Sequence, residues 1–186
     1  VFVVEDHELP LASVSVLVRT GSYLDPPDKI GLASLTGNQM RAGGTTTLGA
    51  AEFDEEAAFL AAQIGSSIGG TSGGASLGCL TKDLDVCLDL FFDMLRNPAF
   101  DEGRLALAKS QSVQGMERRN DATQGIERRE FSRLIRGTSH FTTAPGTRAS
   151  IEAITRDDLV AFHRQYFHPG NFLFAVSGDV DTTAIL

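Results

Sequence analysis

Residues 155–179, TRDDLVAFHRQYFHPGNFLFAVSGD, decide the fold, because they hold a helix signal followed directly by a strand signal. Thr155 and Asp158 have the spacing of a capping box, which predicts that a helix begins here. Pro169 and Gly170 then mark a turn. The run over 171–179 is nearly all apolar, which predicts a strand buried on both faces.

Similar local patterns predict further strands and helices in the residues that precede this stretch. Val14, Val16 and Val18 alternate with other residues, and a period of two indicates a strand with one buried face. We expect strands at about 2–5, 12–20, 66–72 and 75–81, and helices at about 30–42, 50–64, 83–96, 101–119 and 121–136. This order predicts an α+β fold, a mostly antiparallel sheet of about five to six strands packed with helices, as a single domain over residues 1–186.

The composition excludes several classes of protein. An apolar content of 42% and a charged content of 22% are ordinary for a globular domain, and the net charge of -8 argues against nucleic-acid binding. No apolar run approaches the ~18 residues of a membrane span. The cysteines, Cys79 and Cys87, are too few for a disulfide framework, so we expect two small buried residues and leave their redox state open.

The residues alone predict no active site. The four histidines, His7, His140, His163 and His168, are scattered, and the last two are five residues apart, off a common helical face. His163 is therefore expected to be a half-exposed helix residue. Adjacent carboxylates on a helix point apart, so they are expected to be solvated charges and not an acid/base pair.

Four segments of the chain resemble a known protein family, and this resemblance predicts more than the residues alone. The segments 3–35 (VVEDHELPLASVSVLVRTGSYLDPPDKIGLASL), 44–65 (GTTTLGAAEFDEEAAFLAAQIG), 97–100 (NPAF) and 150–181 (SIEAITRDDLVAFHRQYFHPGNFLFAVSGDVD) resemble the pitrilysin/insulinase family of zinc peptidases. That family includes the mitochondrial processing peptidases. The resemblance covers essentially the whole chain and implies the LuxS/processing-peptidase-like metallohydrolase fold, with metalloendopeptidase as the family class.

The resemblance also implies where a catalytic site would lie. In active members the helix after G-x-A carries H-x-x-E-H, whose two histidines bind zinc and whose glutamate activates the bound water. Laid on residues 31–33 (GLA), this pattern places Ser34 and Asn38 at the zinc ligands and Gly37 at the general base. Serine and asparagine are poor zinc ligands beside imidazole, and glycine has no side chain.

The family's third zinc ligand, a glutamate on a later helix, also has no counterpart. Counting from Phe100 places it at Gly115, or at Gln114 one residue earlier, and a supporting glutamate at Ala108. Because all these positions are replaced, the resemblance implies an inactive half-domain. We expect no catalysis and no cofactor in this chain, with zinc only in an active partner.

Such a half-domain pairs in the family with an active zinc-binding homologue or a second half-domain, and the two enclose extended peptides. In active members a peptide adds to the edge strand that follows the second helix. The resemblance places that peptide-docking edge here at Ser67, Ile68, Gly69, Gly70 and Thr71.

Two other functions stay open. In the first, the chain would be a stand-alone peptide-binding or scaffolding module. In the second, it would be a peptidase with a displaced metal site that recruits His163, His168 and nearby acids. Val1 and the final residues 181–186 lie inside a strand signal and a helix signal, so we expect a chain trimmed at both ends. A periplasmic location is favoured over a cytoplasmic one.

Overall fold

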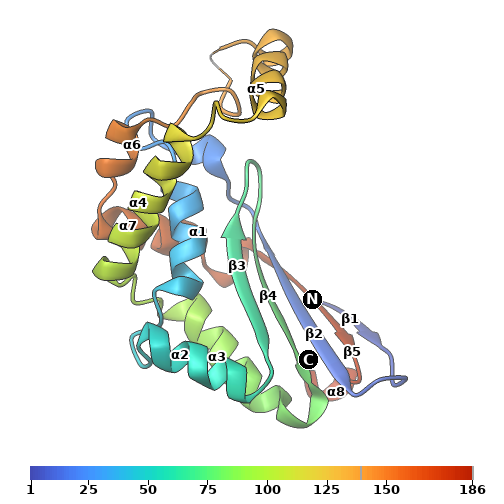
Figure 1. Cartoon of the computed structure of the whole chain (residues 1–186). Coiled ribbons are helices and arrows are strands. Elements are labelled where there is room, and N and C mark those ends of the chain that lie inside the picture. The colour runs from blue at the N-terminus through green and yellow to red at the C-terminus, as the bar shows by residue number, and fades with distance from the viewer. Residues whose placement is uncertain (139, 186) are drawn as a thin grey trace.

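The structure is a computed structural model that describes residues 1–138 and 140–185 (Figure 1). In these residues the strands are β1 (Phe2–Glu5), β2 (Leu11–Val18), β3 (Gln63–Ile68), β4 (Gly73–Leu80) and β5 (Phe172–Gly178). The α-helices are α1 (Leu32–Ala42), α2 (Ala50–Phe59), α3 (Leu84–Arg96), α4 (Glu102–Glu117), α5 (Thr123–Arg136), α6 (Arg148–Glu152), α7 (Arg156–Tyr166) and α8 (Thr182–Ile185). A short 3-10 helix at Ser22–Leu24 precedes α1.

The five strands form one sheet in the order β1-β5-β2-β4-β3. Strand β1 runs parallel to β5, and the other neighbouring pairs are antiparallel. The predicted α+β fold with a mostly antiparallel sheet is therefore confirmed. Strand β3 ends the sheet, and α1 runs alongside it (Figure 1).

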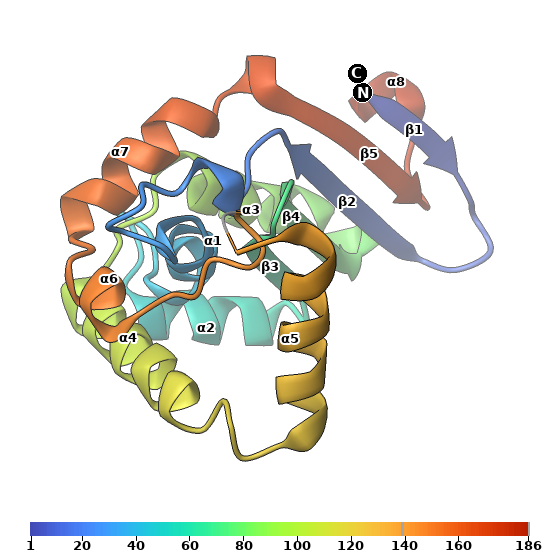
Figure 2. The same ribbon diagram turned by 90° about the horizontal axis from the view of Figure 1, so that it is seen from above.

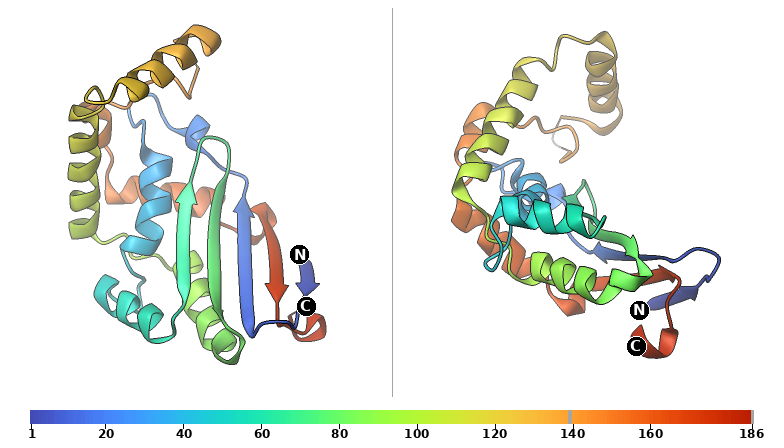
Figure 3. Two further views of the ribbon diagram at one scale, coloured as in Figure 1. Left: turned by 45° about the vertical axis from the view of Figure 1, so that its right-hand side comes forward. Right: turned by 60° about the horizontal axis from the view of Figure 1, so that its bottom comes forward.

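Helices cover one face of this sheet. Ala12, Val14, Val16 and Val18 of β2 are buried, whereas the residues between them are exposed. In Figure 3 the left view looks onto the bare face, with α3 and α7 behind the sheet. Val14 pairs with Leu77 of β4 and faces Val176 of β5, so the buried apolar row crosses the middle strands.

The prediction that β5 is buried on both faces is wrong. Val176 is buried, but Leu173 is 42% exposed and Ser177 is exposed. The physical reason is that, among the described residues, helices cover only one face of the sheet, so alternate residues of this apolar run point to the bare face. An apolar run shows that a strand exists, but not that both of its faces are covered.

Two predicted boundaries are also wrong. Helix α2 ends at Phe59, not at 64, because the chain turns at Ala61, whose φ of 51° is left-handed. Strand β3 consequently starts at Gln63 and ends at Ile68, where a strand over 66–72 was expected. The amide of Gly69 donates to the carbonyl of Ser72 at 2.8 Å, so residues 69–72 form the turn of the β3–β4 hairpin.

The C-terminal elements match the sequence pattern more closely. Thr155 and Asp158 form the expected capping box, in which the Thr155 amide donates to Asp158 Oδ2 at 2.8 Å. Helix α6 was not predicted, because its five residues carry no apolar repeat, yet Thr147 and Ser150 cap it in the same way. Cys79 and Cys87 are both buried and unbridged, which confirms their expected burial.

Candidate functional site

Helix α1 holds the positions where a catalytic site was expected, and its start is fixed by Asp25. Asp25 Oδ2 accepts the amide of Gly31 at 2.9 Å, and Oδ1 accepts the amide of Ala33 at 2.8 Å. Burial raises the pKa of the Asp25 carboxyl, and these two hydrogen bonds oppose the rise. The carboxylate thus satisfies two amides at the helix N-terminus, which otherwise have no partner within the helix.

The three positions on α1 have different surroundings. Ser34 and Asn38 are exposed, and their spacing of four residues places them on one side of the helix. Asn38 Oδ1 accepts a hydrogen bond from the Gln39 side chain at 2.9 Å. Gly37 is buried. The two predicted ligand positions therefore face outward, and the predicted base position faces protein.

Gly37 lies directly against strand β3. A Cβ atom at Gly37 would lie 2.4 Å from the Ile68 amide nitrogen and 2.7 Å from the Ser67 carbonyl carbon. The Ser66 hydroxyl donates to the Gly37 carbonyl at 2.5 Å. The contacting atoms at Ser67 and Ile68 are backbone, which cannot rotate aside, so the position has no room for a carboxylate side chain.

Arg41 makes a second connection between α1 and β3. Its Nε donates to the carbonyl of Ile64 at 3.1 Å, and its Nη1 donates to Asp54 Oδ1 at 2.6 Å. The guanidinium also lies over the Phe53 ring, 4.6 Å from the ring centroid. Sequence reasoning missed both Arg41 and Asp25, because each acts on a backbone group whose neighbourhood only the tertiary fold reveals.

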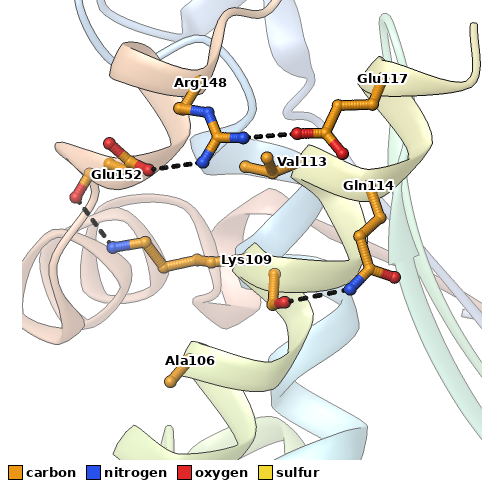
Figure 4. A pocket seen from close by; sticks show the side chains of 8 residues that line it. Ala106, Lys109, Val113, Gln114, Glu117, Arg148 and Glu152 are labelled. Atoms are coloured by element: carbon orange, nitrogen blue, oxygen red, sulfur yellow. Dashed lines mark hydrogen bonds and ion pairs between the residues drawn. The ribbon is translucent and has the colours of Figure 1, made fainter.

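The positions expected on α4 are not arranged as a ligand set. Gly115 is exposed, and no heavy atom lies within 4 Å of a Cβ built there. Ala108 is half-buried. Gln114 lies with Lys109 and Ser110 on a groove of about 480 Å³ between α4 and α6 (Figure 4).

The residues that line this groove form ion pairs and polar contacts with one another. Arg148 contacts Glu117 at 2.5 Å and Glu152 at 3.5 Å. Lys109 Nζ donates to the carbonyl of Glu152 at 2.9 Å, and Gln114 points along α4 toward Ser110 (Figure 4). These charges neutralise one another at the surface, so the groove offers no free ligand set.

The histidines do not form a displaced metal site among the described residues. His163 is half-buried as expected, its Nε2 lies 2.9 Å from the Leu95 carbonyl, and burial lowers its pKa. His168 is exposed in the turn after α7, and His7 contacts Asp179 at 2.7 Å near the other end of the sheet. Within residues 1–138 and 140–185, no three His, Cys, Asp or Glu side chains are placed to hold one metal ion.

The predicted peptide-docking residues divide between a strand and a turn. Ser67 and Ile68 lie in β3, which is the edge strand as expected, whereas Gly69, Gly70 and Thr71 lie in the hairpin turn. The carbonyls of Gly69 and Gly70 accept the amides of Ser22 at 2.9 Å and Tyr23 at 3.3 Å. The turn residues are therefore already engaged within the chain.

Comparisons of this chain with family models and with known proteins point to the same protein family. A model described as Insulinase (Peptidase family M16) matches residues 1–143, and one described as Peptidase M16 inactive domain matches residues 153–186. A crystal structure of a peptidase M16 inactive domain from Pseudomonas fluorescens is similar, with a TM-score of 0.91 and 26% identity. The match covers 98% of this chain and 45% of that one.

Other similar proteins are more distant in sequence. The "Non-peptidase homolog YmxG" of Helicobacter pylori is 24% identical over 95% of this chain and 41% of its own length. The structure of the periplasmic protease PqqL from Escherichia coli shares the fold, with a TM-score of 0.80 and 16% identity over 98% of this chain and 20% of that one. The chain thus spans less than half of the length of these relatives.

Proposed function

The chain belongs to the insulinase family, peptidase family M16, and from that premise we propose that it is a non-catalytic half-domain. It pairs with an active zinc-binding homologue or a second half-domain of the same family, and it helps to enclose extended peptides. It cleaves no peptide bond itself, and any zinc lies in the partner.

The observation that carries this proposal is the contact of Gly37 with β3. The resemblance assigns Gly37 to the family's general-base position, and a Cβ there would lie 2.4 Å from a backbone nitrogen. Ser34 and Asn38, at the two histidine positions, offer weak zinc ligands. The position for the base is filled by the chain itself, so restoring a single residue would not restore the chemistry.

Two exposed apolar surfaces support pairing. The bare face of the sheet carries large apolar side chains that are 42% to 63% exposed: Phe2, Val4, Leu11, Leu17 and Leu173. Helix α5 stands away from the body and buries no residue (Figure 2). Its Phe131, Leu134 and Ile135 are 62%, 85% and 66% exposed. Large apolar side chains that gather on an exposed face are a feature of interaction sites, which supports pairing at these two surfaces.

The length of the relatives supports a proposal for what covers these surfaces. The Pseudomonas fluorescens structure, described as an inactive domain, matches this chain over 45% of its length, so it carries a comparable length beyond the match. A second half of that size is the occupant we propose for the bare sheet face and α5. One structural neighbour is a periplasmic protease, which supports a periplasmic location for this half-domain. Among the described residues, no helix has both the length and the apolar character to cross a bilayer.

The test is to mix the purified chain with a family member that retains H-x-x-E-H and to follow cleavage of a quenched fluorescent peptide. We expect no cleavage by this chain alone, and cleavage by the pair that exceeds cleavage by the homologue alone. Leu134→Ser with Ile135→Ser in α5 should remove that gain, while Glu127→Gln on the same helix should keep it. Cleavage by this chain alone, abolished by a zinc chelator, would contradict the proposal.

We also propose that extended peptides meet this half-domain at the edge strand, at Ser67, Ile68 and the turn that follows. The supporting observation is the position of β3, which ends the sheet and, in the part of the chain that the structure describes, has no strand beyond it, while α1 packs along the same edge. An unpaired strand edge is a template for a peptide in extended conformation. Binding of a peptide that survives Ser66→Pro, which removes a main-chain donor from this edge, would contradict this second proposal.

A further inference from the structure

The register of the β3–β4 hairpin shows which backbone groups face the free edge. Residues paired across an antiparallel ladder alternate between bonded and non-bonded pairs. Gly69 bonds to Ser72, so the bonded pairs continue as Ser67 with Gly74, Gly65 with Ser76 and Gln63 with Gly78. The remaining residues, Ile64, Ser66 and Ile68, direct their backbone amides and carbonyls away from β4.

Helix α1 contacts each of these three residues. Arg41 donates to the Ile64 carbonyl at 3.1 Å, and this bond confirms that the carbonyl points outward. The Ser66 hydroxyl donates to the Gly37 carbonyl at 2.5 Å. Gly37 itself lies against the Ile68 amide. The left view of Figure 3 shows α1 alongside β3, beyond the last strand of the sheet.

The geometry points to a regulatory contact: helix α1 is an autoinhibitory cover over the peptide-docking edge of β3, latched by Arg41 and Ser66. The inference rests on the second proposed function, docking at this edge. A peptide gains the outward groups of Ile64, Ser66 and Ile68 only after β3 separates from α1. A helix that covers a strand edge is also a known way to prevent unwanted pairing.

The strand, not the helix, is the element that moves. Helix α1 buries Leu32, Leu35 and Met40 in the core, and Asp25 fixes its N-terminus. Strand β3 buries only Ile68 among its described residues, and its partner β4 starts with two glycines, Gly73 and Gly74. The amides of Ser22 and Tyr23 hold the turn of the hairpin, so the movement is a bend of β3 below that turn. Glycine adds no side-chain packing to a strand, so β3 bends away from α1 more readily than α1 leaves the core.

The latch predicts that weakening it improves peptide binding. Ser66→Ala removes the bond to Gly37, and Arg41→Met removes the bond to Ile64 while keeping an apolar stem over Phe53. The probe is a fluorescein-labelled ten-residue peptide of alternating Thr and Val, followed by fluorescence anisotropy. We expect about fivefold tighter binding for Ser66→Ala, the effect of losing one ordinary hydrogen bond, and a larger gain for the double variant.

Ser67→Ala is the matched control, since this neighbouring side chain makes no contact with α1 among the described hydrogen bonds and should leave the affinity unchanged. Amide hydrogen exchange at Ile68 should accelerate in Ser66→Ala and stay unchanged in Ser67→Ala. Equal affinity of wild type and Ser66→Ala would overturn the latch and leave docking at the edge intact. Binding by none of the variants would overturn the latch together with edge docking, while the pairing of half-domains would still stand on its own assay.

Discussion

Helices α1 and α5 differ sharply in how much of their surface is buried against the rest of the molecule. Helix α1 buries seven of its residues, is capped by Asp25 and is bonded to β3 through Gly37 and Arg41. Helix α5 buries none and presents Leu134 and Ile135 outward. The helix at the expected site of chemistry packs against β3, and the helix with no expected role presents exposed apolar side chains.

The largest effect should come from Gly37→Glu, which introduces a glutamate at the position that the resemblance assigns to the general base. Its Cβ would overlap the backbone of Ser67 and Ile68, so we expect a loss of about 3 kcal/mol in unfolding free energy. For a chain of this size the midpoint of thermal unfolding should fall by roughly 6–12 °C.

Asn38→Glu is the control for that experiment, because Asn38 is one residue away and exposed. A surface change of this kind should stay within about 0.5 kcal/mol. If Gly37→Glu unfolds at the wild-type temperature, α1 and β3 are not in the contact described, and the claim of a closed site is wrong.

Asp25→Ala should have the next largest effect. The substitution leaves the amides of Gly31 and Ala33 without their acceptor, and a lost N-terminal cap costs about 1–2 kcal/mol. Urea unfolding followed by circular dichroism measures the difference. Asp28→Ala, in the same loop and exposed, is the matched control and should be near neutral. Equal loss in both variants would show that the loop, not the cap, matters.

A smaller effect concerns pH and the pair Lys29–Asp158. Burial of Asp158 acts to raise its pKa, but hydrogen bonds from Lys29 and Thr155 outweigh it and hold the pKa below the ordinary value. A lowered folded-state pKa means a stabilisation present above the unfolded-state pKa and lost as pH falls through the folded value. As the pH falls below about 4, the ordinary value for an aspartate, the wild type should therefore lose more unfolding free energy than Asp158→Asn. Urea titrations at several pH values measure the unfolding free energy of both proteins. If it falls equally with pH in wild type and Asp158→Asn, the prediction is wrong.

The smallest effect on stability is expected for the α5 pair, Leu134→Ser with Ile135→Ser. Both side chains are mostly exposed, so the unfolding free energy of the isolated chain should change by less than about 0.5 kcal/mol. The same variant should also fail to increase peptide cleavage by the catalytic homologue. A marked loss of stability in the isolated chain would mean that α5 packs on its own domain, and the contrast between α1 and α5 would fail.

The sequence predicted the order of elements well, because that order depends on local signals. The alternation around Val14, Val16 and Val18 and the capping box at Thr155 and Asp158 are local patterns, and the structure confirms both. The end of α2 was misplaced because Ala61 adopts a left-handed conformation that its residue type does not announce. The exposed side of β5 was missed because an apolar run does not reveal how many layers cover it.

The candidate site was harder to predict, because its decisive features are contacts between distant segments. The resemblance placed Ser34, Gly37 and Asn38 on one helix. The sequence alone shows only that these positions lack the side chains of a zinc site, and it does not show what surrounds them. That Gly37 is needed for the approach of Ile68, 31 residues later in the chain, follows only from the packing of α1 on β3. Arg41 and Asp25 bond to backbone atoms, which carry no side-chain signal in the sequence.

The central claim, that this half-domain has lost the metal chemistry of its family, is tested most directly by the zinc content of the chain. The purified protein, loaded with excess zinc and desalted, is measured by inductively coupled plasma mass spectrometry beside an H-x-x-E-H homologue. We expect about one zinc ion per homologue chain and a small fraction of one per chain of this protein. About one zinc ion bound to this chain, lost on changing His163 or His168 to alanine, would contradict it and establish a displaced metal site.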